Sequence, residues 1–109
     1  MNRTYLKWDY MGTKGSIKEK NSIKLKEPKR YNVVMHNDDF TTMEFVVEIL
    51  IDIFHKDAIT AENIMMTVHK SDKAVIGSYT YGIAVTKVNQ SMSRARQEGF
   101  PFRMTVEEA

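Results

Sequence analysis

Residues 43–54 constrain the fold most narrowly, because they have the pattern of a helix that is apolar over more of its circumference than an ordinary surface helix. Nine of these twelve residues are apolar, and the three exceptions Glu44, Glu48 and Asp52 recur every four positions. That spacing places three carboxylates on one narrow stripe, whereas an ordinary surface helix needs an apolar stripe only a little wider than about 100°. This helix must therefore either be packed on most of its sides or leave apolar surface exposed, and its start is a reasonable place for an apolar pocket.

Charge divides the chain into two parts. Residues 1–30 contain nine Lys or Arg against three Asp or Glu, a net charge of +6, and residues 31–109 carry a net charge of −4. The first part shows no amphipathic period, so it buries too little apolar surface to offset its chain entropy. We predict a flexible basic extension over residues 1–29 and one folded domain over residues 30–109. Tyr5, Trp8 and Tyr10 are either a docking element or incidental members of an idle tail.

Composition excludes several classes of protein. The absence of cysteine excludes a disulfide framework, a thiolate zinc site and a cysteine nucleophile. Because there is no run of about eighteen apolar residues and no apolar segment after Arg3 and Lys7, we expect neither a membrane-spanning helix nor a secretory signal. We predict a soluble, cytoplasmic protein. The basic arm raises nucleic acid as a partner, but the folded part is acidic and lacks a nucleic-acid-binding motif, so we expect neither nucleic acid nor a membrane as partner.

The remaining patterns predict the element order β-α-α-β-α-β. Strands are expected over residues 31–36, 73–79 and 102–106, and helices over about residues 43–55, 60–70 and 81–97. Thr41 with Glu44 has the spacing of a capping box for the first helix. Thr60 and Thr80 are expected to cap the second and third helices, and Gly99 to end the third.

A polar turn between the first strand and the first helix allows three kinds of chemistry. Asn37, Asp38 and Asp39 suit a turn that caps the helix. Together with His36 or His69 they are a weak signal for a metal site, and with His69 alone they suit an acid/base pair. The second helix adds a wall nearby, with one apolar face made of Ala61, Ile64, Met65 and Val68. A lone histidine beside such a face is more often structural, and the residues alone leave these alternatives open.

Residues 31–46 read YNVVMHNDDFTTMEFV, and this run resembles the signature of the bacterial ClpS adaptors. The resemblance continues through MMTVH at 65–69, KAVIG at 73–77, Thr80 and TKV at 86–88, so it covers the whole folded region. It implies an adaptor that delivers proteins with destabilising N-terminal residues to a Clp AAA+ protease, with a flexible N-terminal extension that engages the unfoldase. It also implies an α+β sandwich of three helices on a three-stranded antiparallel sheet, similar to the C-terminal domain of the ribosomal stalk protein.

Carried over position by position, the resemblance implies a site for the substrate's α-amino group at Asn37, Asp38 and His69. It implies a side-chain pocket, with Ile49 at its floor, made of Thr41, Met43, Val46, Ile49, Met65, Val68 and Phe102. Lys87 and Gly82 fall on the face that contacts the unfoldase. Gly82 stands where the family often has an acidic residue, and Thr42 stands where many members have Pro.

The chemistry of an N-terminal residue agrees with this carry-over. A free N-terminus is mostly an ammonium near neutral pH, because its reference pKa is about 8. An Asn carbonyl, a carboxylate and a neutral imidazole can accept its hydrogen bonds. We predict a non-enzymatic adaptor, without metal or cofactor, that binds N-terminal Leu, Phe, Tyr or Trp for a ClpA-like or ClpC-like unfoldase with its peptidase. The alternative is a small metal-dependent or acid/base enzyme using Asp38, Asp39 and His69.

Overall fold

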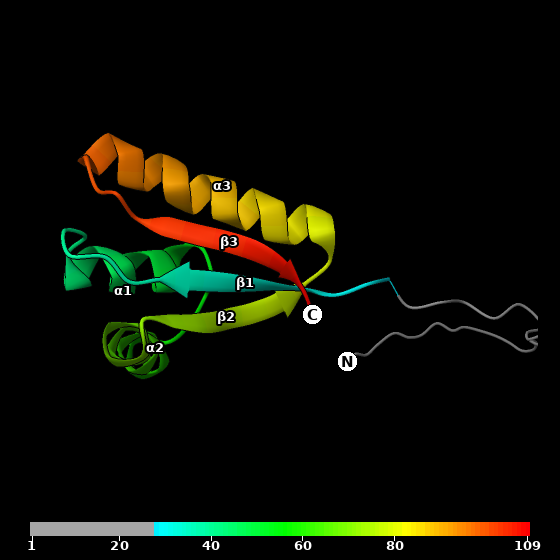
Figure 1. Ribbon diagram of the computed structural model, residues 1–109, viewed down its shortest axis with the longest axis horizontal. Helices are drawn as coiled ribbons and strands as arrows, with labels where there is room; N and C mark the ends of the chain where they lie inside the picture. Colours follow the sequence, from blue (N-terminus) through cyan, green and yellow to red (C-terminus); the bar gives the residue numbers. More distant parts are fainter. Residues whose placement is uncertain (1–27) are drawn as a thin grey trace, which may run out of the picture.

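The computed structural model describes residues 28–109, which form one three-stranded sheet and three helices (Figure 1). In chain order the elements are β1 (Tyr31–His36), α1 (Met43–Asp52), α2 (Ala58–Ser71), β2 (Lys73–Tyr79), α3 (Tyr81–Glu98) and β3 (Arg103–Glu108). This confirms the predicted element order and the α+β fold class. The predicted basic extension lies outside the described residues up to position 27, and so do its aromatic residues Tyr5, Trp8 and Tyr10.

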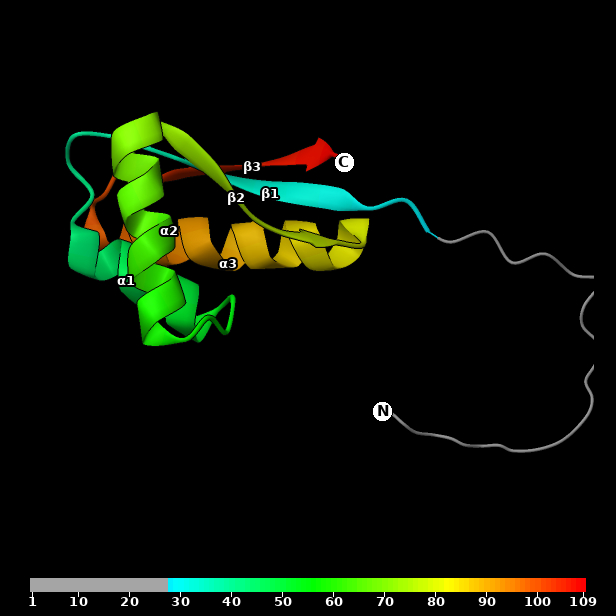
Figure 2. The same cartoon turned by 90° about the horizontal axis from the view of Figure 1, so that it is seen from below.

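The sheet is antiparallel throughout, with β1 at its centre in the order β2-β1-β3. Val33 and Met35 of β1 are fully buried in the hydrophobic core. In Figure 2, α3 runs along the sheet, while α1 and α2 pack against each other at one end of it. The end of β1 therefore meets the start of α1 and the last turn of α2 at the same end of the domain.

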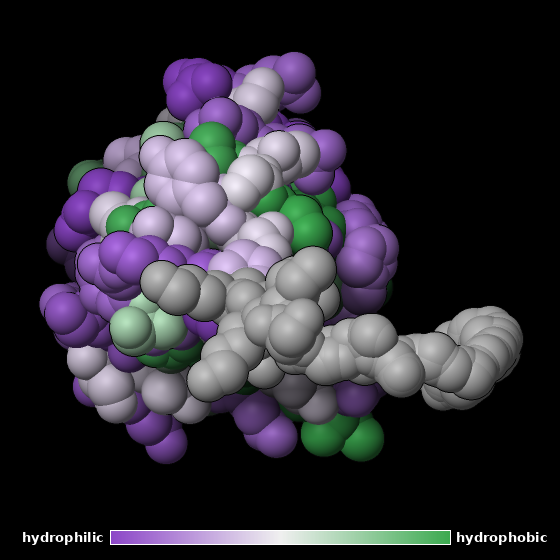
Figure 3. Space-filling view, turned by 90° about the vertical axis from the view of Figure 1, so that its right-hand side faces the viewer, coloured by the Kyte–Doolittle hydropathy of each residue, from purple (hydrophilic) through white to green (hydrophobic). Residues whose placement is uncertain are grey.

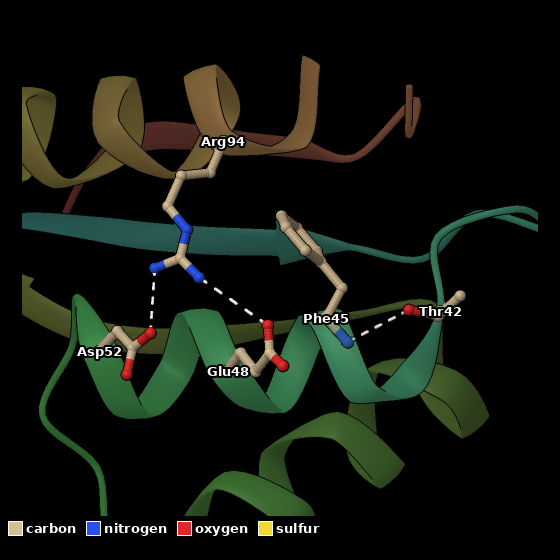
Figure 4. Close-up of polar contacts among 5 residues, drawn as sticks. All are labelled: Thr42, Phe45, Glu48, Asp52 and Arg94. Atoms are coloured by element: carbon tan, nitrogen blue, oxygen red, sulfur yellow. Dashed lines mark hydrogen bonds and ion pairs between the residues drawn. The ribbon is translucent and has the colours of Figure 1, made fainter. Parts of the chain in front are cut away.

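The helix α1 lies between α2 and α3 (Figure 4), but its apolar residues Met43 and Ile51 remain exposed, so both expected outcomes occur in part. Its residues Phe45, Ile49 and Leu50 are buried. Two residues of the acidic stripe contact α3, where Arg94 pairs with Asp52 at 3.1 Å and with Glu48 at 3.8 Å. These ion pairs are partly exposed, so each contributes at most about 1 kcal/mol to stability.

Two of the predicted helix caps are wrong. Thr42 caps α1, because its hydroxyl oxygen accepts a hydrogen bond from the N–H of Phe45 at 3.2 Å. Thr41 instead belongs to the preceding loop, where its N–H and its hydroxyl both donate to Asp38. Asp57 caps α2, where its Oδ1 accepts from the N–H of Thr60 at 2.8 Å. The second helix therefore begins before Thr60, which lies within its first turn.

The third helix has the predicted boundary residues. Thr80 occupies the N-cap position, although its side chain makes no capping hydrogen bond. Gly99 ends the helix in the left-handed conformation (φ 78°), where the N–H of Phe100 donates to the carbonyl of Ala95 at 2.9 Å. The other predicted ends shift by one to three residues: α1 stops at Asp52, and β3 covers Arg103–Glu108.

The surface at the start of β1 and α3 is mixed in polarity. Figure 3 looks onto this end and shows separate hydrophobic patches among hydrophilic residues. Two exposed apolar side chains, Tyr81 and Ile83, belong to the first turn of α3. Among residues 28–109, no helix combines the length and the apolar content that crossing a membrane requires.

Candidate functional site

A hydrogen bond ties the loop after β1 to the turn after α2. The N–H of Asn37 donates to the carbonyl of Asp72 at 2.8 Å. Asp72 itself ends α2 in the left-handed conformation (φ 78°), and its N–H donates to the carbonyl of Val68 at 2.9 Å. Because of this connection, Asn37 and His69 border the same cavity although they are distant in sequence.

The cavity has a volume of about 230 Å³ and lies between this loop, α1, α2 and the residue before β3. It is lined by Met35, His36, Asn37, Asp38, Asp39, Thr41, Met43, Val46, Met65, Val68, His69 and Phe102. Three of its apolar residues are buried, while Asn37, Asp39 and His69 are exposed at its mouth. Sites for drug-sized ligands usually measure roughly 300–1,000 Å³, so this cavity suits a single large side chain with a polar group at the entrance.

The structure brings nine of the ten residues predicted for the amine site and the pocket to this cavity. Ile49 is the exception, because it is fully buried in the core and does not line the cavity. It lies one helical turn after Phe45 on the buried face of α1. Met35, the last core-facing residue of β1, lines the cavity instead, and the alternating burial expected of a strand is the signal that could have identified it.

Asp38 is largely engaged within its own loop. Its Oδ1 accepts hydrogen bonds from the N–H of Phe40 at 2.8 Å and the N–H of Thr41 at 2.7 Å, and its Oδ2 accepts from the Thr41 hydroxyl at 2.7 Å. Burial acts to raise the pKa of Asp38, but these hydrogen bonds outweigh it and lower the pKa below the ordinary value. The carboxylate is therefore ionised at neutral pH and holds three donors of the loop.

Asp39 was not among the predicted amine-site residues, yet it lines the same cavity. Its side chain is exposed and forms neither a hydrogen bond nor an ion pair with any other residue of the range 28–109. Within the described part of the chain, nothing occupies the lone pairs of the Asp39 carboxylate, in contrast to those of Asp38.

His36 lines the cavity too and is held at the end of β1. Its Nε2 lies 2.8 Å from the hydroxyl oxygen of Thr105 on β3. Its neighbours across the sheet are Lys73 on β2 and Arg103 on β3. Burial, followed by these two cations, lowers the pKa of His36 below its ordinary value of 6.5. The ring is neutral at pH 7, so its contact with Thr105 fixes the strand end beside Asn37 without adding charge.

The polar groups at the mouth are mostly acceptors. Among residues 28–109, no group of three or more His, Cys, Asp or Glu side chains is arranged to hold a metal ion. An amide oxygen, a free carboxylate and an imidazole can instead surround a small cation that carries several N–H donors. An ammonium group is such a cation.

The two residues predicted for unfoldase contact lie on α3. Gly82 is in the first turn of α3, which lies at the other end of the sheet from the start of α1 (Figure 1), and a Cβ added at Gly82 would meet no other atom within 4 Å. The ammonium of Lys87 donates to the carbonyl of Ile53 at 2.7 Å, and it lies 5.6 Å from the ring centre of Phe54 and 5.7 Å from that of Tyr79. The positive charge of Lys87 therefore stabilises the C-terminal end of α1.

Comparisons with known proteins agree with one another. Residues 26–105 match the family model described as ATP-dependent Clp protease adaptor protein ClpS. A protein of Desulforapulum autotrophicum named ATP-dependent Clp protease adapter protein ClpS is 49% identical over 96 residues, which cover 84% of this chain and 92% of that protein. A protein of the same name from Paraburkholderia xenovorans is 48% identical over 95 residues, covering 87% and 91%.

A solved structure is similar as well. It is that of Agrobacterium tumefaciens ClpS2 bound to L-phenylalaninamide, with a TM-score of 0.74 and 35% sequence identity. The match covers 76% of this chain and 100% of that one.

Proposed function

Because the chain belongs to the ClpS family of ATP-dependent Clp protease adaptors, we propose that it binds proteins by a free N-terminal residue with a large apolar side chain. It then delivers them to a Clp unfoldase with its peptidase. One observation carries the proposal: an apolar cavity sized for one side chain has exposed acceptors at its mouth. The ligand of the similar ClpS2 structure, L-phenylalaninamide, supports it because that ligand joins a free amine to an aromatic side chain.

In this proposal the ammonium of the substrate binds at the mouth of the cavity. The side-chain oxygen of Asn37, the carboxylate of Asp39 and the imidazole of His69 accept its hydrogen bonds. Asp38 keeps the loop in shape, because three of its lone pairs already accept bonds from Phe40 and Thr41. A hydrogen bond to a charged group contributes roughly 1.5–3 kcal/mol, and less where water competes for it.

The first side chain of the substrate then fills the cavity. Its walls are the buried Met35, Val68 and Phe102, with Thr41, Met43, Val46 and Met65 nearer the mouth. Burying a Leu or Phe side chain contributes roughly 1.5–3 kcal/mol. We therefore propose Leu, Phe, Tyr and Trp as the accepted N-terminal residues, because these side chains are large and unbranched at Cβ.

Fluorescence anisotropy with three labelled peptides tests the recognition step. One begins with Leu, the second is its N-acetylated form and the third begins with Ala. We expect only the first to bind, because the second lacks the ammonium and the third lacks the side chain. Equal binding of the acetylated peptide would contradict the proposal and would favour the alternative enzyme using Asp38, Asp39 and His69, since such an enzyme does not require a free amine. That alternative has less support, because hydrogen bonds within the loop occupy Asp38.

For delivery we propose roles for residues 1–29 and for the surface of α3 around Gly82 and Lys87. The basic composition of residues 1–29 supports a role in binding the unfoldase. Removing residues 1–26 deletes none of the cavity-lining residues. Affinity for the Leu peptide should therefore persist while degradation of a Leu-initiated reporter protein stops. Unchanged degradation by the shortened chain would exclude the extension from delivery.

A further inference from the structure

Methionine side chains supply part of the cavity wall. Met35, Met43 and Met65 line the cavity, and Met35 is fully buried. By contrast, 46% of Met43 is exposed and Met65 is only half-buried. These two residues also line a second hollow, which lies between α1 and α2. Two methionines of the proposed substrate site are therefore accessible to small molecules in solution.

We propose that Met43 and Met65 form a redox-sensitive modification site, at which a hydroperoxide oxidises the thioethers and weakens the binding of N-terminal residues. This inference rests on the proposed function of the cavity. The sulfur attacks the terminal oxygen of the peroxide: a sulfur–oxygen bond forms, the oxygen–oxygen bond breaks, and the hydroxyl proton moves to the leaving oxygen. The sulfur loses two electrons to the peroxide, and the products are a methionine sulfoxide and water, or an alcohol where the peroxide is organic.

Oxidation changes the wall on which the first side chain of the substrate packs. A thioether is apolar and flexible, whereas a sulfoxide is polar and chiral. In the free protein, water forms hydrogen bonds with the sulfoxide oxygen. A Leu or Phe side chain displaces that water and offers no donor in its place. The acceptors Asn37, Asp39 and His69 keep their chemistry, so oxidation weakens the apolar half of the site and leaves the polar half unchanged.

Other methionines determine how selective the modification is. Met35 and Met104 are 0% and 3% exposed and belong to the packed core, which excludes a peroxide from them while the chain is folded. Met66 is 37% exposed but lines neither hollow. Successive residues of a helix point about 100° apart, so Met66 faces away from the wall that its neighbour Met65 forms. Met66 is therefore a matched control, since it is accessible to the oxidant and remote from the substrate.

Peroxide treatment of the full-length chain tests the proposal. The protein is treated with hydrogen peroxide, freed of the oxidant, and assayed by anisotropy with a Leu-initiated peptide that contains no methionine. Mass spectrometry of proteolytic fragments identifies the sulfoxides. The wild type is compared with Met43→Leu/Met65→Leu, with Met43→Leu alone and with the control Met66→Leu. Leu keeps nearly the volume of Met but cannot be oxidised. The measured quantity is the ratio of Kd after treatment to Kd before it, so any effect of the substitution itself cancels.

We expect treatment to raise the Kd of the wild type and of Met66→Leu by about fivefold or more, and that of the double variant by less than about twofold. Met43→Leu alone should lie between these values. Methionine sulfoxide reductases, one for each epimer, should restore the Kd of the oxidised wild type. An equal rise in the double variant would overturn the proposal and assign the loss to other methionines. An unchanged Kd in the treated wild type would also overturn it while leaving the proposed function intact. Absence of binding by the untreated wild type would overturn both.

Discussion

Asp38 and Asp39 are adjacent, and we expect Asp38→Asn mainly to lower stability and Asp39→Asn mainly to weaken binding of the substrate. Asp38→Asn keeps an oxygen in place of Oδ1, so the N–H groups of Phe40 and Thr41 keep their acceptor. It removes the negative charge and the anionic acceptor of the Thr41 hydroxyl. Asp39→Asn removes a carboxylate that has no hydrogen-bond partner among the other residues of the range 28–109.

We expect Asp38→Asn to have the larger effect on stability and Asp39→Asn to have the larger effect on binding. Asp38→Asn weakens one charged hydrogen bond at a half-buried site, which lowers the free energy of unfolding by about 1–2 kcal/mol. Asp39→Asn changes an exposed residue, so its effect stays within about 0.5 kcal/mol. For binding, Asp39→Asn removes a hydrogen bond to the ammonium of about 1.5–3 kcal/mol, which raises Kd by roughly 10- to 100-fold. Asp38→Asn removes only a longer-range attraction to the ammonium, and such an attraction, taken at a separation of about 6 Å, changes Kd by roughly threefold in water.

Urea denaturation and anisotropy with the Leu peptide measure the two quantities on the same samples. Asp38→Ala serves as a third variant, because it loses all three hydrogen bonds and should lose both stability, by about 2–4 kcal/mol, and affinity. The reasoning is refuted if Asp38→Asn, at an unchanged free energy of unfolding, weakens binding as much as Asp39→Asn does. Asp38 would then be the partner of the ammonium.

Met43→Ala should narrow the preference for Leu over Ile at the first position of a peptide, because overpacking of a β-branched side chain against this thioether costs about 1–3 kcal/mol; an unchanged Leu-to-Ile affinity ratio would mean that Met43 does not select. Lys87→Met should lower the free energy of unfolding by about 1–2 kcal/mol in urea, because the ammonium loses the carbonyl of Ile53 and two aromatic rings. Gly82→Ala should raise the free energy of unfolding by about 1 kcal/mol, because Ala favours a helix more than Gly does and a Cβ at this position meets no other atom; a lower free energy of unfolding would show a steric clash. The pKa of His36 is lower in the folded chain than the ordinary 6.5, so the unfolded chain binds more protons and stability should fall as the pH drops below about 6.5. His36→Gln should make the free energy of unfolding depend less on pH below about 6.5. The same pH dependence in the variant and the wild type would exclude His36 as the group responsible.

The strands and the order of the elements were predictable because periodicity and β-branched residues determine them locally. The strands β1 and β2 have the predicted bounds Tyr31–His36 and Lys73–Tyr79. The helix caps were less predictable, because neighbouring side chains compete for the same role. Thr41 and Thr42 are equally good caps by composition, and only their contacts distinguish them: Thr41 donates to Asp38, whereas Thr42 accepts from the N–H of Phe45.

In the site, too, the sequence predicted which residues lie together but not which partners their side chains have. Nine of the ten residues predicted from the resemblance line one cavity, because members of a family share the positions that lie together in the fold. It did not distinguish a carboxylate engaged by its own loop from a free one at the next position, as Asp38 and Asp39 show. It also placed Ile49 at the floor of the pocket, although the register of α1 turns that residue into the core. Such details depend on side-chain partners that no sequence pattern specifies.

The polar and apolar halves of the cavity have to act together. The acceptors at the mouth are exposed, so water competes for each hydrogen bond and keeps its contribution near the lower end of roughly 1.5–3 kcal/mol. The buried walls gain another 1.5–3 kcal/mol or so from a Leu or Phe side chain. Association itself costs at least about 4 kcal/mol, so neither half alone leaves appreciable affinity. An internal Leu lacks the ammonium and an N-terminal Ala lacks the side chain, so in the proposed function the weakness of each half would make the site selective for large apolar N-terminal residues.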